Sequence, residues 1–304
     1  MYHFDWPGSP ENIGPRLVEI ARTAEDAGFS SFWVMDHFFQ VGQGFGPPEA
    51  PMLEGYSVMA YLAAVTQCMK LGLMVTGNPY RHPGVLIKTV TTLDVLSGGR
   101  AYLGIGAGWY EPEARCLGIP FPSSKKELVR RLEETLKIAK HMWKDDSSSF
   151  EGEYYHLLAP INHPPPLTRP HPPILIGCEK ERKMLQLVAQ YADAVNFHLG
   201  TPLSGFWETG KKWYEKRFER LPRKLRKLKR CCEEIGRPFD DIEKTILTTV
   251  RLGPKETKPQ DVVIMCNELK EMGFDHAIFN MPNVHEVEPL RTFGDEIIPE
   301  LRYL

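Results

Sequence analysis

Short apolar runs alternate with longer amphipathic segments along almost the whole chain. The short runs favour β-branched and aromatic residues, whereas the longer segments repeat apolar residues at spacings of three and four, as helices do. We predict strands at residues 2–5, 31–36, 70–76, 100–105, 173–176, 194–197, 244–250 and 276–279. We predict helices, several of which end at a glycine, at residues 15–27, 56–68, 83–96, 125–142, 182–191, 211–235, 260–272 and 287–301.

Eight strand–helix units indicate an α/β fold, and we predict a single (β/α)8 barrel domain over residues 1–304. The length of 304 residues and the hydrophobic content of 42% suit one such domain. An open doubly wound sheet with extra strands produces much the same alternation and is the alternative.

Two segments are too long to be simple connections, and we predict that they are insertions after the fourth and sixth strands. Residues 145–173 are polar and proline-rich around a short β-like run at 150–157, as in functional loops or lids. Residues 200–230 carry a dense basic run whose apolar residues recur at near-helical spacing. This run predicts a solvated amphipathic helix rather than a nucleic-acid surface.

Charge and composition narrow the choice of partner. The 37 basic and 39 acidic residues leave a net charge of −2, which gives no field to attract nucleic acid or a membrane, so a small molecule is the expected partner. The N-terminus resembles no leader peptide, and no run approaches the roughly 18 apolar residues of a membrane span. Six scattered cysteines without a CxxC pair predict no metal site and a reducing, cytoplasmic location.

Candidate chemistry lies where predicted strands end, because barrel enzymes hold their reacting groups there. After the second strand stand Asp36 and His37, and a histidine gives or takes a proton near neutral pH. The alternative is that Asp36 caps the next segment while His37 packs beneath it. After the third strand, Gly77 and Asn78 permit unusual backbone geometry.

The residues that follow Asn78 offer charge and hydrogen bonds to an anionic cofactor. Arg81 and His82 are the candidates, although an ordinary turn into a helix that begins with Pro83 explains the segment equally.

Two further strand ends are rich in glycine. Gly106, Ala107 and Gly108 follow the fourth strand and let the backbone approach a planar or phosphorylated ligand, with Trp109 as a wall. Their GxGxG spacing is not that of a Rossmann dinucleotide site. The fifth strand runs into a helix through residues 177–182, where free N–H groups could hold a phosphate. Glu179 and Glu181 oppose an anion there, whereas Lys180 and Arg182 favour one.

Several stretches, in this order and spacing, resemble the luciferase-like monooxygenase superfamily, and within it the branch of coenzyme F420-dependent oxidoreductases. They are EIARTAEDAGFSSFWVMDHFFQ, PMLEGYS, LGLMVTGNPYRHPGVLIKTVTTLDVLSGGR, LGIGAGWYE, RLEETLKIAKHMW, FEGEYYHL, RPHPPILIG and LQLVAQYADAVN. The match is close over residues 4–200 and weaker beyond them.

The resemblance implies a barrel, often a homodimer, that binds F420 or reduced FMN in its mouth. It implies a non-prolyl cis peptide at the Gly77–Asn78 step behind the cofactor ring, with His37 as the proton carrier that Asp36 orients. With these candidates, the full set of predicted cofactor-binding residues is Gly77, Asn78, Tyr80, Arg81, His82, Gly106, Ala107, Gly108, Trp109, Gly177, Cys178, Glu179, Lys180 and Asn196.

The chain departs from the family at two places. Relatives are glycine-rich after strand five, whereas this chain reads Gly177-Cys178-Glu179-Lys180. Relatives that oxidise glucose 6-phosphate have a glutamate directly after the strand-four glycines, where this chain has Trp109. The nearest following carboxylate, Glu111, is our third catalytic candidate, and sugar-phosphate oxidation is disfavoured.

The predicted function is hydride transfer between F420 and an organic substrate. One alternative is a monooxygenase supplied with reduced FMN by a separate flavin reductase. The other is a barrel that binds a cofactor without catalysis, or has lost it.

Overall fold

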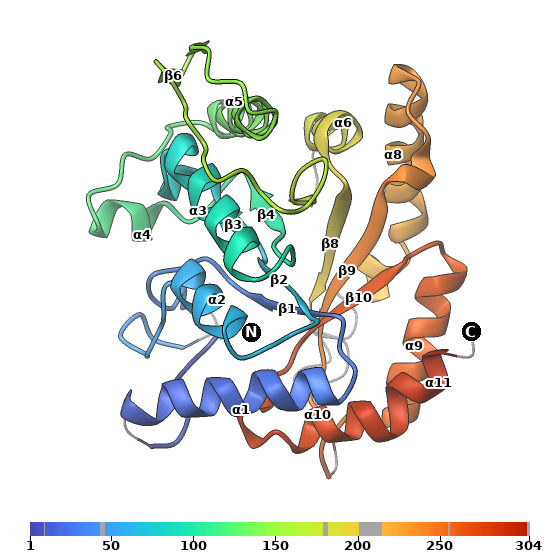
Figure 1. Cartoon of the computed structure of the whole chain (residues 1–304). Helices are drawn as coiled ribbons and strands as arrows, with labels where there is room; N and C mark the ends of the chain where they lie inside the picture. The colour runs from blue at the N-terminus through green and yellow to red at the C-terminus, as the bar shows by residue number, and fades with distance from the viewer. Residues whose placement is uncertain (9, 43–45, 179–181, 201–214, 255, 303–304) are drawn as a thin grey trace. The chain divides into compact units, whose positions relative to one another are not determined.

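The computed structural model describes residues 1–8, 10–42, 46–178, 182–200, 215–254 and 256–302 (Figure 1). They fall into two compact units. The N-terminal unit comprises residues 2–5 and 31–177, and the C-terminal unit comprises residue 1, residues 6–30 and the described residues from 178 onward.

The N-terminal unit is built on short parallel strands. Strand β1 (Ser31–Val34) pairs with β2 (Lys70–Leu73), and β4 (Leu103–Gly106) pairs with both β3 (Thr76–Gly77) and β7 (Ile174–Gly177). A parallel bridge between Leu71 and Ala101 places β2 beside the start of β4. Because these strands are parallel, their C-terminal ends share one edge, where Asp36 and His37 follow β1.

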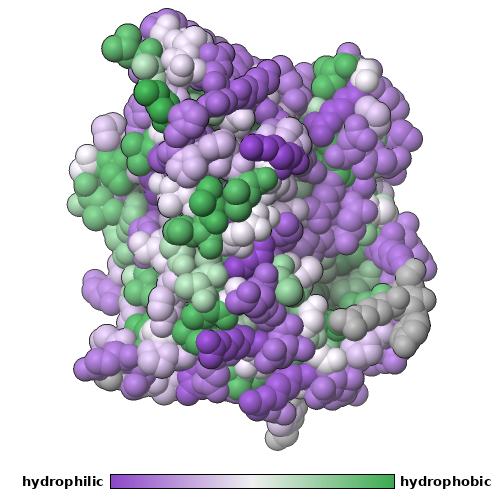
Figure 2. All heavy atoms as spheres, in the orientation of Figure 1, coloured by the Kyte–Doolittle hydropathy of each residue, from purple (hydrophilic) through white to green (hydrophobic). Residues whose placement is uncertain are grey.

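Helices α2 (Gly55–Ala63), α3 (Pro83–Leu96) and α5 (Lys125–Trp143) accompany these strands, and α3 packs on both α2 and α5. A shallow groove of about 380 Å³ lies over α2 and α3, with Val85 and Leu96 exposed along it. Figure 2 shows hydrophobic residues at the surface over α3. The short helix α4 (Glu111–Cys116) follows β4 and was not predicted.

The long polar segment 145–173 is ordered by a hairpin. Strands β5 (Phe150–Glu151) and β6 (His156–Leu157) pair antiparallel, in agreement with the β-like run expected there. The Glu134 carboxylate of α5 accepts hydrogen bonds from the backbone N–H groups of Glu153, Tyr154 and Tyr155 at 2.7–3.1 Å. The hairpin is therefore anchored to α5 by one buried acid.

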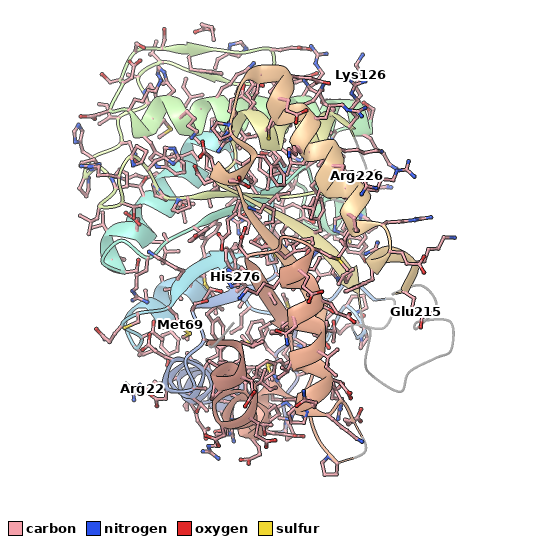
Figure 3. All side chains as sticks on the ribbon, turned by 90° about the vertical axis from the view of Figure 1, so that its right-hand side faces the viewer. Arg22, Met69, Lys126, Glu215, Arg226 and His276 are labelled. Carbon is pink, nitrogen blue, oxygen red and sulfur yellow. The ribbon has the colours of Figure 1, made fainter. Side chains whose placement is uncertain are left out.

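The C-terminal unit contains the parallel strands β8 (Ala194–Gly200), β9 (Glu243–Thr249) and β10 (His276–Asn280), in that order. At the start of β10, His276 pairs with Glu243 of β9 at 3.0 Å (Figure 3). The unit's helices are α1 (Ile13–Asp26), α6 (Arg182–Tyr191), α8 (Leu221–Ile235), α9 (Pro259–Glu271), α10 (Glu288–Thr292) and α11 (Ile298–Arg302).

Helix α8 is amphipathic, as the basic run predicted. Its Leu221, Leu225 and Leu228 are buried, whereas Arg226 points outward (Figure 3). Residues 201–214 of the predicted insertion lie outside the described part of the chain.

The strand predicted at residues 2–5 is wrong. These residues form no strand, and the Gln40 side-chain amide donates a 2.9 Å hydrogen bond to the Tyr2 carbonyl. Buried Phe4 and Trp6 produce the alternating pattern of a strand, but the backbone forms no strand-to-strand hydrogen bonds with a neighbour.

The described helices include none long and apolar enough to cross a membrane.

Candidate active site

Asp36 follows β1 and is buried in an ion-pair network. Its carboxylate accepts two hydrogen bonds from the Arg81 guanidinium, at 2.6 and 2.9 Å, and one from the Gly77 N–H at 3.0 Å. Burial raises the pKa of Asp36 above its usual value, and the Arg81 charge only partly offsets that effect. Asp36 thus ties the end of β1 to the end of β3.

Arg81 is fully engaged within the same network. It also pairs with Glu54, whose carboxylate caps α2 by accepting from the N–H groups of Tyr56 and Ser57. Its guanidinium lies 4.9 Å from the Tyr56 ring centroid and 5.6 Å from that of Phe38. The charge of Arg81 therefore stabilises the protein's own carboxylates, whereas the sequence suggested that it would meet an anionic cofactor.

His37 is held by a carboxylate that the sequence did not single out. Its Nδ1 lies 2.8 Å from Oε2 of Glu113, a buried residue of α4. The other Glu113 oxygen accepts from the backbone N–H groups of Phe38 at 2.5 Å and Phe39 at 3.2 Å. Asp36 was expected to orient His37, and this was wrong: Glu113 does so, because the Asp36 oxygens are occupied by Arg81 and Gly77.

The protonation of this pair follows from its hydrogen bonds. Burial alone would raise the pKa of Glu113, but hydrogen bonds from His37 and Tyr80 bring that pKa below its ordinary value. An ionised Glu113 only accepts, so Nδ1 of His37 carries its proton. In the neutral imidazole the Nε2 lone pair is then free to accept a proton, and no hydrogen bond to Nε2 occurs among the described residues.

Three aromatic rings surround His37, each roughly perpendicular to it. The centroids of Trp109 and Tyr110 both lie 5.9 Å from the His37 ring, and that of Tyr80 lies at 6.2 Å. Trp109 is 64% exposed, although it is a large apolar side chain. The His37 ring thus lies beside an exposed aromatic side chain.

The glycines of this edge accommodate the protein's own side chains. A Cβ on Gly106 would lie 2.9 Å from the Val75 side chain, and one on Gly177 would lie 3.2 Å from it. A Cβ on Gly77 would lie 2.6 Å from the Tyr80 ring. We expected Gly106 to bring backbone close to a ligand, Gly77 to permit unusual backbone geometry and Gly177 to open a phosphate site. In the structure the absence of a Cβ at these positions makes room for Val75 and Tyr80.

The non-prolyl cis peptide is three residues earlier than the resemblance implied. It joins Met74 and Val75, and the Gly77–Asn78 step is not among the cis bonds of the described chain. The chain therefore has a non-prolyl cis peptide between β2 and β3, and its predicted place at Gly77–Asn78 was wrong. Its Val75 side chain rests against Gly106 and Gly177.

Asn78 has an unmet capacity for hydrogen bonding. It is 1% exposed, and neither its side-chain oxygen nor its nitrogen has a partner among the described residues. Buried polar atoms nearly always have partners, so the Asn78 amide has the capacity to hold a bound group through both a donor and an acceptor.

Other predicted residues have varied positions. His82 caps α3, accepting from the Gly84 N–H at 3.3 Å, while Ala107 is partly buried and Glu111 is exposed. Cys178 and Asn196 belong to the C-terminal unit, where the Cys178 N–H donates to the Asn196 carbonyl at 2.9 Å. Glu179 and Lys180 lie outside the described residues.

The fold and this edge define an α/β barrel oxidoreductase of the luciferase-like kind. The luciferase-like monooxygenase family model matches residues 3–269, and the chain belongs to that family. The F420-dependent glucose-6-phosphate dehydrogenase of Amycolatopsis mediterranei is 24% identical over 100% of both chains. The FMNH2-dependent dimethylsulfone monooxygenase of Pseudomonas putida is 30% identical over 52% of this chain and 42% of its own.

Solved structures show the same fold. An F420-dependent secondary alcohol dehydrogenase, in complex with an F420–acetone adduct, superposes with a TM-score of 0.77 at 19% identity. The match covers 97% of this chain and 96% of that one. The predicted (β/α)8 fold class is therefore confirmed.

Proposed function

We propose that this protein transfers hydride between coenzyme F420 and an organic substrate, with His37 as the proton carrier. The observation that carries the proposal is the His37–Glu113 pair at the strand edge, which holds Nε2 uncommitted beside an exposed aromatic surface. The full-length relative from Amycolatopsis mediterranei supports F420 as the cofactor.

The residues of the N-terminal unit fit such a cofactor. A deazaflavin ring system ends in adjacent carbonyl and N–H groups, and the unpartnered Asn78 amide offers the matching donor and acceptor. Val75 at the cis peptide and Asn78 would hold the ring. When bound, F420 supplies a carbon that takes or gives hydride.

The chain's own contribution is then to position the substrate and move its proton. In the oxidising direction His37 Nε2 accepts the proton of a substrate hydroxyl, and the adjacent Glu113 carboxylate stabilises the resulting imidazolium. Asp36 and Arg81 fix the loop from which His37 projects. Glu111, which is exposed, has no part in this scheme.

The alternative is a monooxygenase that uses reduced FMN from a separate flavin reductase. The relative from Pseudomonas putida favours it. A barrel that binds a cofactor without catalysis is the third possibility, since residues 177–180 depart from the family's glycine-rich loop.

We also propose that the whole chain forms one barrel domain, located in the cytoplasm and paired as a homodimer. The exposed Val85 and Leu96 over α2 and α3 support self-association. Sedimentation equilibrium measures the mass directly.

Oxygen separates the two enzymatic functions. Turnover with F420 should proceed at the same rate under anaerobic conditions and in air, because hydride exchange consumes no oxygen. A rate that depends on oxygen, with reduced FMN as the only effective cofactor, would instead establish the monooxygenase.

A further inference from the structure

The loop after β4 presents two aromatic rings beside His37. The Trp109 and Tyr110 rings lie 5.0 Å apart, and each meets the His37 ring edge-on. We call these two side chains the aromatic wall. An indole that is 64% exposed leaves a large apolar face in water, which is costly unless something covers it.

Gly108, the residue before the aromatic wall, constrains the backbone from which the wall projects. Gly108 has a φ of 88°, and a Cβ there would lie 2.6 Å from the Pro79 ring. A glycine is therefore required by both the backbone angle and the contact with Pro79. This constrained turn fixes the backbone from which Trp109 projects, next to His37.

The charges around His37 indicate what this wall can receive. Among the described residues, His37 makes its ion pair with one carboxylate and its ring contacts with three aromatic side chains, and none of these partners is a cation. Arg81 approaches the Phe38 ring, but its charge is already shared by Asp36 and Glu54. A phosphate next to His37 would meet the negative charge of Glu113, and the recorded partners of His37 among the described residues include no cation to offset that repulsion.

We infer that the substrate carries no charged group near its reacting carbon and packs a flat or apolar face against the Trp109 ring. A secondary alcohol or ketone that bears an aromatic ring has these properties. The inference rests on the proposed function for its chemistry. In the oxidising direction the carbinol C–H bond breaks, and the hydride, with its two electrons, passes to F420. The hydroxyl proton goes to His37 Nε2, and the product is the ketone.

The test is calorimetric titration of the F420-loaded protein with acetophenone and, separately, with glucose 6-phosphate. Acetophenone should bind, and Trp109→Ala should weaken it about tenfold, since an aromatic contact and its buried area are lost. Trp109→Phe, which keeps a ring, should change its affinity less than about threefold. Leu158→Ala, at a side chain 89% exposed in the β5–β6 hairpin, is the matched control.

Two results would overturn the inference. One is acetophenone binding that Trp109→Ala leaves unchanged, or no acetophenone binding at all. The other is tighter binding of glucose 6-phosphate than of acetophenone.

A second titration keeps this inference distinct from the proposed function. Acetophenone is titrated into the protein without cofactor, and F420 binding is measured on its own. If acetophenone binds in a Trp109-dependent way to a protein that does not bind F420, the aromatic wall is confirmed as a substrate-binding surface and the proposed F420-dependent function is contradicted. F420 binding with no acetophenone affinity would do the reverse.

Discussion

Two buried arginines of the N-terminal unit stand at opposite ends of its strands and have different partners. Arg100 precedes β4 and donates five hydrogen bonds to neutral oxygens of Ala63, Thr66, Met69 and Ser97 at 2.7–3.0 Å. Arg81 follows β3 and pairs with the carboxylates of Asp36 and Glu54. Both side chains are largely enclosed by protein.

The difference shows that the N-terminal ends of the strands serve the stability of the fold, whereas the C-terminal ends also serve catalysis. At the N-terminal end, Arg100 satisfies carbonyl groups that would otherwise be buried without donors. At the C-terminal end, Arg81 pairs with the buried carboxylate of Asp36, directly before His37, while a second acid, Glu113, contacts the proton carrier itself. The hydrogen bonds of Arg100 should therefore affect the free energy of unfolding alone, whereas the ion pairs of Arg81 should affect both that free energy and the catalytic rate.

The largest effect expected at the C-terminal end is on catalysis. His37→Asn should lower turnover by roughly 10²–10⁴-fold, because the proton loses its carrier. The free energy of unfolding and the affinity for F420 should change little. Steady-state kinetics, urea unfolding and cofactor titration measure the three quantities, and an unchanged turnover number would remove His37 from the mechanism.

At the N-terminal end the expected effect is on stability alone. Arg100→Met should reduce the free energy of unfolding by about 4–5 kcal/mol, since several buried acceptors lose their donor at once. Urea unfolding measures the loss, with the exposed Arg22→Met as the control (Figure 3). The comparison fails if Arg100→Met unfolds at the same urea concentration as the wild type.

Glu113→Gln should damage catalysis by about 10²-fold, because an amide does not hold the Nδ1 proton of His37 as a carboxylate does. Nitrogen NMR of His37 should show a mixture of tautomers in place of one. The pKa of Glu113 is lower in the folded state than its ordinary value of 4.5. The wild-type carboxylate therefore stabilises the fold at pH values above about 4.5, and this contribution is lost as the pH falls below that value. The stability difference between wild type and variant should therefore vanish in acid.

Arg81→Met should lower the free energy of unfolding by about 2–3 kcal/mol at neutral pH, because it leaves Asp36 buried without its counter-ion. Without Arg81 the pKa of Asp36 rises further above its ordinary 3.8. The folded state then binds more protons than the unfolded state, so stability falls as pH rises above about 4. Urea unfolding at several pH values should show a deficit that is smallest near pH 4, and a pH-independent deficit would contradict this account.

The hydrophobic pattern was sufficient to locate most strands and helices, because burial and periodicity are local properties. It failed at residues 2–5, where buried Phe4 and the following Trp6 imitate a strand that does not pair. The resemblance implied a non-prolyl cis bond but placed it at Gly77–Asn78, three residues after its position at Met74–Val75. The glycines that accommodate the Val75 side chain, Gly106 and Gly177, belong to other strands, so no local pattern located the bond.

The candidate site was predicted only in part for a similar reason. His37 was found because it follows a predicted strand directly. Glu113 was missed in favour of Glu111, two residues earlier, because α4 was not predicted. On a helix, residues two apart point to different sides, so only one of the two acids reaches the β1 loop. Had α4 been predicted, the positions of Glu111 and Glu113 on different sides of that helix would have made Glu113 a separate candidate.

The most direct test of the central claim is a comparison of cofactor affinities. The purified protein is titrated with F420 and with FMN, each oxidised and reduced, and the dissociation constants are measured by calorimetry. The account predicts that F420 binds at least about tenfold more tightly than either form of FMN, a difference of about 1.4 kcal/mol. Preferential binding of reduced FMN, or no binding of either cofactor, would contradict it.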